Sequence, residues 1–203
     1  MKRKYHIITF GCQMNVLDSE RMEGILLEQG YSSSSSPEQA DLIIINTCTV
    51  RQKPERKALS LLGRLSQSKA SSFKPILGIC GCVAQQYGRE LLKRFSGLNF
   101  VLGTNQVYRL GEVLERVESG ERVALTDWAE ESDCLFQASK LRPVRGVSAF
   151  VTIMEGCDNF CAYCIVPYVR GRERSRKPED IISEINWLAE KGVKEVILLG
   201  QNV

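Results

Sequence analysis

Three cysteines, Cys157, Cys161 and Cys164, lie close together in the second half of the sequence. Their spacing, Cys-x3-Cys-x2-Cys, lets one loop surround a compact metal centre, and thiolates are preferred ligands of zinc and of iron–sulfur clusters. A structural zinc ion requires four ligands, but no Cys or His follows Cys164. A 4Fe–4S cluster held by three cysteines leaves one iron open for another ligand. These loop cysteines therefore favour an iron–sulfur cluster, with zinc or a loop without a cofactor as alternatives.

Three further cysteines, Cys12, Cys48 and Cys82, each come just after a short apolar run typical of a β-strand. The runs span residues 6–10, 41–46 and 75–79. Helical patterns separate them, which predicts an open, doubly wound parallel sheet. The carboxyl ends of parallel strands share one edge, where ligands bind, so we expect these strand-end cysteines to meet there. The alternative is that each is a small buried residue that ends a strand by chance.

Two cysteines remain outside both sets. Cys80 lies two positions before Cys82 and is interpreted as structural, although it is close enough to be an alternative ligand. Cys134 lies in a stretch without periodicity and is interpreted as structural too.

The elements that would position the cysteines follow from periodicity. The first helix is expected over 16–29, with Asn15 and Asp18 as a pair resembling a capping box at its start. The fold class is α/β: a flavodoxin-like, doubly wound parallel sheet over 1–127, a linker over 128–147, and over 148–203 the start of a βα barrel. Further helices are expected near 54–65, 90–95, 107–117 and 178–191, and further strands at 99–102, 148–154 and 194–199.

Composition restricts the class of protein. The 203 residues include 27 Lys and Arg against 24 Asp and Glu, a formal net charge of +3 that does not by itself indicate nucleic-acid binding. No apolar run approaches the length of a membrane span, and the run behind Lys2, Arg3 and Lys4 is too short for a signal peptide. We therefore expect a cytoplasmic protein without membrane contact, in a reducing setting where cysteines serve metal binding or catalysis.

A basic stretch follows the loop cysteines. Five positive charges occur in the eight residues from Arg170 to Lys177. A solvated loop is one interpretation. The other is contact with an anion, because guanidinium groups bind carboxylate and phosphate oxygens.

The segment from Met154 to Cys164 resembles the radical S-adenosylmethionine (SAM) enzymes. In that family three cysteines hold a 4Fe–4S cluster, whose open iron binds SAM and whose electron cleaves it to a 5′-deoxyadenosyl radical. The resemblance assigns that cluster to Cys157, Cys161 and Cys164. The segment 166–175 is similar to the family's cluster-proximal stretch, so Arg170, Arg172 and Arg176 are predicted to bind the SAM carboxylate or RNA phosphate. Gln201, at a strand end, is predicted to contact SAM.

Three short motifs resemble the amino-terminal domain of one branch, the radical SAM methylthiotransferases. They are Gly11-Cys12-Gln13-Met14-Asn15, Asn46-Thr47-Cys48 and Gly81-Cys82-Val83-Ala84. Members of this branch carry a second 4Fe–4S cluster, which the resemblance assigns to Cys12, Cys48 and Cys82. The resemblance thus implies two 4Fe–4S clusters and SAM as cofactors.

Residues 11–15 and 199–203 look most like the methylthiotransferases that act on N6-(dimethylallyl)adenosine beside the anticodon of tRNA. The implied reaction is 2-methylthiolation of that base, with tRNA as substrate and a flavodoxin or ferredoxin as electron donor. Alternatives are a relative acting on threonylcarbamoyl-adenosine in tRNA, a non-catalytic iron–sulfur or zinc RNA-binding module, and a flavodoxin-like electron carrier.

The resemblance also sets an expectation about extent. A βα barrel takes about 250 residues, and family members continue with the rest of a partial barrel and a small RNA-binding β domain of the TRAM type. Neither is found in these 203 residues. We therefore expect an incomplete, truncated enzyme. We expect it to keep the amino-terminal cluster but to lack a complete SAM pocket and a complete tRNA-binding surface. It would therefore be inactive alone.

Overall fold

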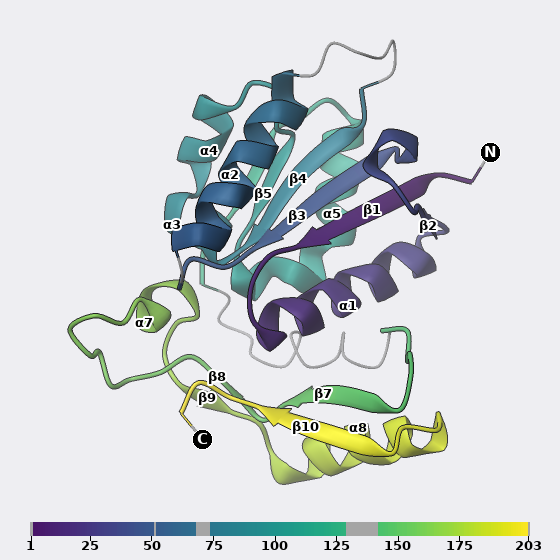
Figure 1. The fold of residues 1–203 in the computed structure, drawn as a ribbon, viewed down its shortest axis with the longest axis vertical. Coiled ribbons are helices and arrows are strands. Elements are labelled where there is room, and N and C mark those ends of the chain that lie inside the picture. The colour runs from purple at the N-terminus through teal and green to yellow at the C-terminus, as the bar shows by residue number, and fades with distance from the viewer. Residues whose placement is uncertain (1, 51, 68–73, 129–141, 203) are drawn as a thin grey trace.

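The computed structural model describes residues 2–50, 52–67, 74–128 and 142–202. The first part of the chain forms a six-stranded, fully parallel sheet with the order β2-β1-β3-β4-β5-β6 (Figure 1). This order confirms the predicted flavodoxin-like, doubly wound sheet. The short edge strands β2 and β6 were not predicted, because two or three residues carry no periodic signal. The strands are β1 (Lys4–Thr9), β2 (Ser32–Ser33), β3 (Leu42–Thr47), β4 (Ile76–Gly81), β5 (Phe100–Leu102) and β6 (Val123–Leu125).

Helices cover both faces of this sheet (Figure 1). Helices α1 (Gln13–Glu28) and α5 (Leu110–Glu118), the latter preceded by the 3-10 turn η2 (Thr104–Arg109), lie on one face. The other face carries α2 (Gln52–Gln67), α3 (Cys82–Tyr87) and α4 (Arg89–Arg94). A second 3-10 turn, η1 (Pro37–Gln39), precedes β3.

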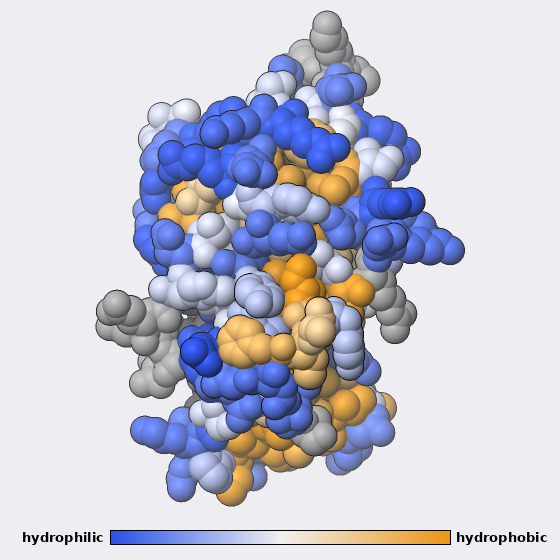
Figure 2. Space-filling view, turned by 90° about the vertical axis from the view of Figure 1, so that its left-hand side faces the viewer, coloured by the Kyte–Doolittle hydropathy of each residue, from blue (hydrophilic) through white to orange (hydrophobic). Residues whose placement is uncertain are grey.

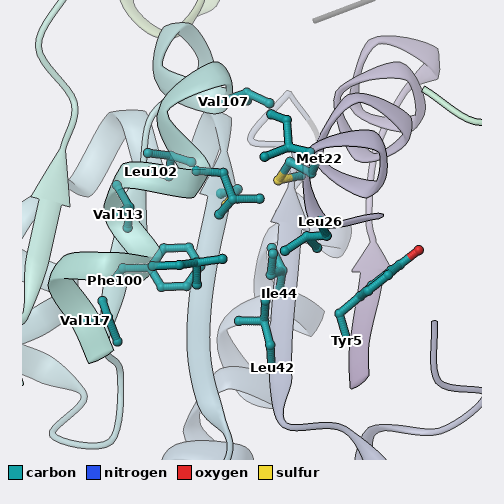
Figure 3. Packing of buried hydrophobic residues seen from close by; sticks show 14 of the residues in the cluster. Tyr5, Met22, Leu26, Leu42, Ile44, Phe100, Leu102, Val107, Val113 and Val117 are labelled. Carbon is teal, nitrogen blue, oxygen red and sulfur yellow. The ribbon is translucent and has the colours of Figure 1, made fainter. Parts of the chain in front are cut away.

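Each face of the sheet has its own hydrophobic core. In the first core, Met22 and Leu26 of α1 and Val113 of α5 meet Ile44 and Phe100 from the strands (Figure 3). All six residues of β3 are buried, as expected for a central parallel strand that is covered on both faces. The sheet is therefore a rigid platform whose carboxyl-terminal edge can hold side chains in fixed positions.

The start of the first helix differs from the prediction. Cys12, not Asn15, is the residue that precedes α1, and both Asn15 and Asp18 are buried inside the helix. Asn15 reaches back one turn, where its Oδ1 accepts a hydrogen bond from the Cys12 backbone N–H at 3.3 Å. The capping pair was therefore wrongly placed, because Asn15 serves the cysteine before the helix instead of beginning it. Helix α3 was also missed.

The second part of the chain is a strand–loop–helix–strand unit, as predicted. Strands β7 (Ser148–Thr152) and β10 (Glu195–Leu199) pair in parallel and are connected through α8 (Pro178–Glu190). Between them, β8 (Met154–Glu155) pairs antiparallel with β9 (Arg174–Ser175), and the one-turn helix α7 (Val166–Val169) lies in the connection. The predicted strand over 148–154 is thus interrupted at Ile153.

The two parts of the chain are packed against each other. Met14 and Leu17 of α1 form a small core with Phe150 of β7 and Leu199 of β10. The hydroxyl of Thr104 in η2 donates a hydrogen bond to the Val169 carbonyl of α7 at 2.6 Å. In Figure 1 the second part lies below α1.

Most of the predicted linker, and with it Cys134, lies outside the described residues. Two linker arginines are described, and both reach helix α1. Arg142 pairs with Glu20 at 2.9 Å, and Arg145 pairs with Glu23 at 2.6 Å. Among the described residues, no helix has both the length and the hydrophobicity that spanning a bilayer requires.

Candidate metal centres

The strand-end cysteines stand at one edge of the sheet, as the topology predicted. In the parallel register Thr9 of β1 lies beside Asn46 of β3, and Thr47 of β3 lies beside Gly81 of β4. The three strands therefore end at almost the same level. Cys48 and Cys82 come directly after their strands, and Cys12 follows β1 after a two-residue turn. A Cβ atom added to Gly11 would lie 2.6 Å from Cβ of Cys48, which shows how closely this turn approaches β3.

The three thiols interact with one another. A hydrogen bond with the Cys48 thiol is the main cause that lowers the pKa of Cys12 to about 5 and the pKa of Cys82 to about 6. The same contacts, first with Cys12 and then with Cys82, raise the pKa of Cys48. Cys48 thus lies between the other two thiols and interacts with both. A lowered pKa favours the thiolate, which is the form of cysteine that binds metal.

A buried amide network fixes these strand ends. The Asn46 Nδ2 group donates to the Asn15 carbonyl at 2.8 Å, and the Asn15 Nδ2 group donates to the Thr47 carbonyl at 3.0 Å. The Thr47 hydroxyl donates to the Cys80 carbonyl at 2.6 Å. Asn15, Asn46 and Thr47 are fully buried. Sequence reasoning did not identify them as supporting residues, although polar side chains beside buried strands could have indicated it.

Gly81 is required by the backbone between β4 and α3. Its φ is +87°, a conformation that favours glycine, and an added Cβ would lie 2.4 Å from the Thr47 carbonyl oxygen. Because Gly81 can lie this close to the Thr47 carbonyl, α3 can begin at Cys82 directly after the strand. Cys80, one residue before Gly81, lies in the hydrophobic core, in keeping with its structural interpretation. Its side chain is part of the core beneath α1 and α5, and burial raises its pKa.

The loop cysteines occupy a single loop between β8 and α7. Cys157 is buried, Cys164 is half-buried and Cys161 is exposed, so the three residues differ in their exposure to solvent. The Cys164 N–H donates to the Cys161 carbonyl at 2.9 Å, and the Cys157 N–H donates to the Gly171 carbonyl at 3.1 Å. The loop is thereby closed on itself and attached to the segment that follows α7.

Gly156 allows this attachment. Its φ is +80°, and an added Cβ would lie 2.1 Å from the Arg172 carbonyl oxygen, a distance that no side chain tolerates. Its N–H donates a hydrogen bond to Oε1 of Gln201 at 2.5 Å. Gln201, the predicted SAM contact, therefore lies beside the start of the cysteine loop.

The predicted anion-binding arginines have different environments. Arg170 and Arg176 are buried, whereas Arg172 is exposed. Arg170 donates to Asp18 at 2.8 Å, and Arg176 donates to Glu184 and to the Thr152 carbonyl. Arg172 lies over the Phe160 ring, with Cζ 5.2 Å from the ring centroid. Arg170 and Arg176 thus engage protein groups here, and the predicted SAM or RNA contacts of all three arginines stay predictions.

Buried charges that were not predicted from the sequence connect the two parts of the chain. Arg21 of α1 lies 3.3 Å from Asp18 on its own helix and 3.4 Å from Glu155 of β8. Arg170 meets Asp18 from the other side. Glu155 stands two residues before Cys157, so the network runs from the strand-end cysteines toward the loop cysteines. Asp18 and Arg21, on the inward face of α1 beside Leu17, were the available signal.

A cavity of about 330 Å³ opens next to the loop. On the face that carries this region, hydrophobic residues reach the surface at mid-height between hydrophilic ones (Figure 2). The combination of aromatic rings and guanidinium groups in its lining suits a flat, anionic ligand. The lining includes Asn105, Trp128, Phe160, Arg172 and Arg174.

The donor chemistry fits iron–sulfur clusters at both sets. Within the described ranges, no three or more Cys, His, Asp or Glu side chains are grouped to hold a single metal ion. A 4Fe–4S cluster is bound differently, because each thiolate takes a separate iron. Thiols on three strand ends, or spread along one loop, suit that mode of binding.

Comparison with known families agrees with this geometry. Residues 4–103 match the uncharacterized protein family UPF0004, and residues 151–203 match the radical SAM superfamily. Each model matches part of the chain, and the second match agrees with the resemblance to radical SAM enzymes inferred from the cysteine loop.

Two curated relatives with high sequence identity to this chain have the same name. The chain is 49% identical over 203 residues to the tRNA-2-methylthio-N(6)-dimethylallyladenosine synthase of Pelotomaculum thermopropionicum, covering 99% of this chain and 45% of that protein. It is 50% identical over 198 residues to the synthase of the same name from Geobacter metallireducens. That match covers 98% of this chain and 45% of that protein. The chain matches the amino-terminal portion of such synthases and spans less than half of their length.

Solved structures give a more distant likeness. The cobalamin-dependent SAM radical enzyme OxsB, solved with aqua-cobalamin and SAM bound, superposes with a TM-score of 0.58 at 12% identity. The match covers 98% of this chain and 34% of that one. At this identity the likeness concerns the fold alone.

Proposed function

We propose that this chain is the cluster-bearing amino-terminal part of an enzyme that 2-methylthiolates N6-(dimethylallyl)adenosine beside the anticodon of tRNA. The observation that carries the proposal is the meeting of Cys12, Cys48 and Cys82 at one sheet edge, in a chain that also holds the loop cysteines. The high identity to the synthases supports the choice of substrate. We take residues 1–127 as the amino-terminal domain, 128–147 as the linker and 148–203 as radical SAM sequence.

Cys157, Cys161 and Cys164 would hold one 4Fe–4S cluster, with SAM at its open iron. Such a cluster would supply the electron for the reductive cleavage of SAM. The protein's part is to hold the loop in place: Gln201 accepts the Gly156 N–H, and the Gly171 carbonyl accepts the Cys157 N–H. Arg172 and the aromatic cavity beside the loop are available to a nucleotide-like ligand.

Cys12, Cys48 and Cys82 would hold the second 4Fe–4S cluster, the one associated with sulfur insertion in the methylthiotransferases. The partners we propose are tRNA as substrate and a flavodoxin or ferredoxin as electron donor, in the cytoplasm. The lowered pKa values of Cys12 and Cys82 support this assignment, because a cluster binds deprotonated sulfur.

The first experiment measures metal content. The chain is reconstituted anaerobically with iron and sulfide, and iron, sulfide and zinc are determined alongside the electron paramagnetic resonance spectrum of the reduced protein. Two 4Fe–4S clusters correspond to about eight irons per chain, and alanine at all three positions of either set should remove about half. Zinc binding without iron would instead favour a non-catalytic RNA-binding module.

The second experiment addresses the substrate. A hybrid carries these 203 residues in place of the corresponding portion of the Pelotomaculum thermopropionicum synthase. We expect it to form the 2-methylthio nucleoside on tRNA that contains N6-(dimethylallyl)adenosine, detected by mass spectrometry of digested tRNA. The matched control is the same hybrid with Cys48→Ala, which should cleave SAM without forming the product. Product on threonylcarbamoyl-adenosine instead would reassign the substrate.

A further inference from the structure

Arg170 reaches the strand-end cysteines from the other part of the chain. It follows α7 directly, yet its guanidinium is 4% exposed and donates from Nη2 to Oδ2 of Asp18 on α1 at 2.8 Å. Asp18 thereby fixes the guanidinium at the interface between the two parts. The residues joined by this bond are 152 positions apart in the sequence.

One end of this guanidinium has no nitrogen or oxygen acceptor among the described residues: Nη1 of Arg170 is buried and makes no such hydrogen bond. The Arg170 side chain interacts instead with the Cys82 thiol, whose pKa it helps to lower. A buried N–H group without an acceptor is costly, by about 1–3 kcal/mol, so its presence calls for a ligand or a function. A structural ion pair with Asp18 alone would not require it.

The groups next to Arg170 are the cysteine sulfurs. After the hydrogen bond with Cys48, the Arg170 charge is among the causes that lower the pKa of Cys12 and of Cys82. Arg170 therefore lies near two of the three thiols. α7 also packs against α3, the helix that begins at Cys82.

We propose that Arg170 is a component of the metal centre at Cys12, Cys48 and Cys82, to which it brings a buried positive charge and an N–H donor from the second part of the chain. The inference rests on the proposed second cluster. Three thiolates give such a cluster a net negative charge, which increases on reduction. Charge and hydrogen bonds near the sulfurs set the reduction potential, and a buried cation favours the more negative, reduced state.

The proposal has a structural consequence. The amino-terminal sheet supplies all three thiols. The positive charge of Arg170 reaches them only when the segment after α7 is docked against α1. Asp18 orients the guanidinium, so the potential of the centre depends on the packing of the two parts. This gives the buried pair a function beyond stability, to which buried ion pairs often add little.

The test uses the full 203-residue chain with alanine at Cys157, Cys161 and Cys164, so that a cluster can form only at the strand-end cysteines. In this background Arg170→Met, Arg170→Lys and Arg142→Met are compared by redox titration followed by electron paramagnetic resonance. Arg142 is the matched control: it is 3% exposed and also bridges the two parts, through Glu20 and Glu184, but neither carboxylate belongs to the cysteine edge.

Arg170→Met should shift the one-electron reduction equilibrium at least tenfold toward the oxidised state, which is about 59 mV. Arg170→Lys keeps the charge and should shift it less, and Arg142→Met should leave the potential unchanged. If Arg170→Met does not fold, the pair Asp18→Asn with Arg170→Met removes both charges. It should shift the potential in the same direction but by less, because the smaller effect of the Asp18 charge at Cys82 opposes that of Arg170.

An unchanged potential in Arg170→Met would overturn the inference while leaving the proposed cluster intact. An equal shift in Arg142→Met would overturn it too, because the effect would then come from domain packing. A parent protein that takes up no iron at the strand-end cysteines would overturn the proposed function and this inference together. Folding of every variant is checked by circular dichroism.

Discussion

Asn46 at the end of β3 donates a hydrogen bond from its side chain to the backbone carbonyl of Asn15 on α1, at 2.8 Å. Asn15 in turn donates to the Thr47 carbonyl, so the helix after Cys12 and the strand before Cys48 are joined in both directions. The position of the strand-end cysteines is therefore set by buried amides and not by the thiols alone.

The Asn46 amide should be needed for metal retention. Asn46→Ala removes a buried donor that serves Asn15 and Ser19, which should destabilise the fold by about 1–3 kcal/mol and reduce iron at the strand-end cysteines. Asn99→Ala is the matched control. It loses one side-chain bond, to the Leu77 N–H at the start of β4, away from the cysteine edge. Denaturant unfolding and iron analysis separate the two effects, and equal iron loss in both variants would contradict the role of Asn46.

The two neighbouring cysteines of β4 and α3 should differ in their effect on iron. Cys82→Ala should remove the iron bound at the strand-end cysteines, because Cys82 is one of the interacting thiols. Cys80→Ala should keep that iron and lose only about 1 kcal/mol of stability, since its side chain lies in the hydrophobic core. Iron and sulfide determination after reconstitution distinguishes them. Loss of iron in Cys80→Ala with retention in Cys82→Ala would exchange their roles.

Gly156→Ala should disrupt the cysteine loop. The added Cβ would meet the Arg172 carbonyl oxygen at 2.1 Å, so the loop must move and the iron bound by the loop cysteines should be lost. Gly192→Ala is a matched control in the same part of the chain. It has a similar positive φ of +93° but no atom within 4 Å of the added Cβ, so it should cost only about 1 kcal/mol and leave iron unchanged. Iron retained at wild-type level in Gly156→Ala would refute the packing argument.

Glu184 should be important for stability because it serves two buried arginines. Its carboxylate accepts from Arg142 and from Arg176, and it is 1% exposed. Glu184→Gln removes the carboxylate charge that two buried guanidinium groups share, although Arg142 keeps its pair with Glu20, and should destabilise the fold by about 3–5 kcal/mol. Glu112→Gln, which loses a solvent-accessible pair with Arg109, should cost less than about 1 kcal/mol. Equal unfolding midpoints in the two variants would contradict this prediction.

The sequence by itself determined the fold class and the two sets of cysteines. Apolar runs before Cys12, Cys48 and Cys82 specify strands, and parallel strands with intervening helices bring their carboxyl ends to one edge whatever the details of packing. Local spacing likewise defined the loop from Cys157 to Cys164. Short-range patterns were sufficient because each depends only on neighbouring residues and on the period of a strand or helix.

Only the tertiary structure decided which polar groups surround these cysteines. Asn15 and Asp18 were interpreted as a capping pair because sequence spacing reveals only local partners. In the structure they have local partners in Cys12 and Arg21, and also distant ones in Asn46, Thr47 and Arg170. Arg170 looked like one of several exposed anion-binding residues of a basic stretch. Burial against Asp18 is a long-range event that no periodicity encodes, because it depends on how the segment after α7 docks on α1.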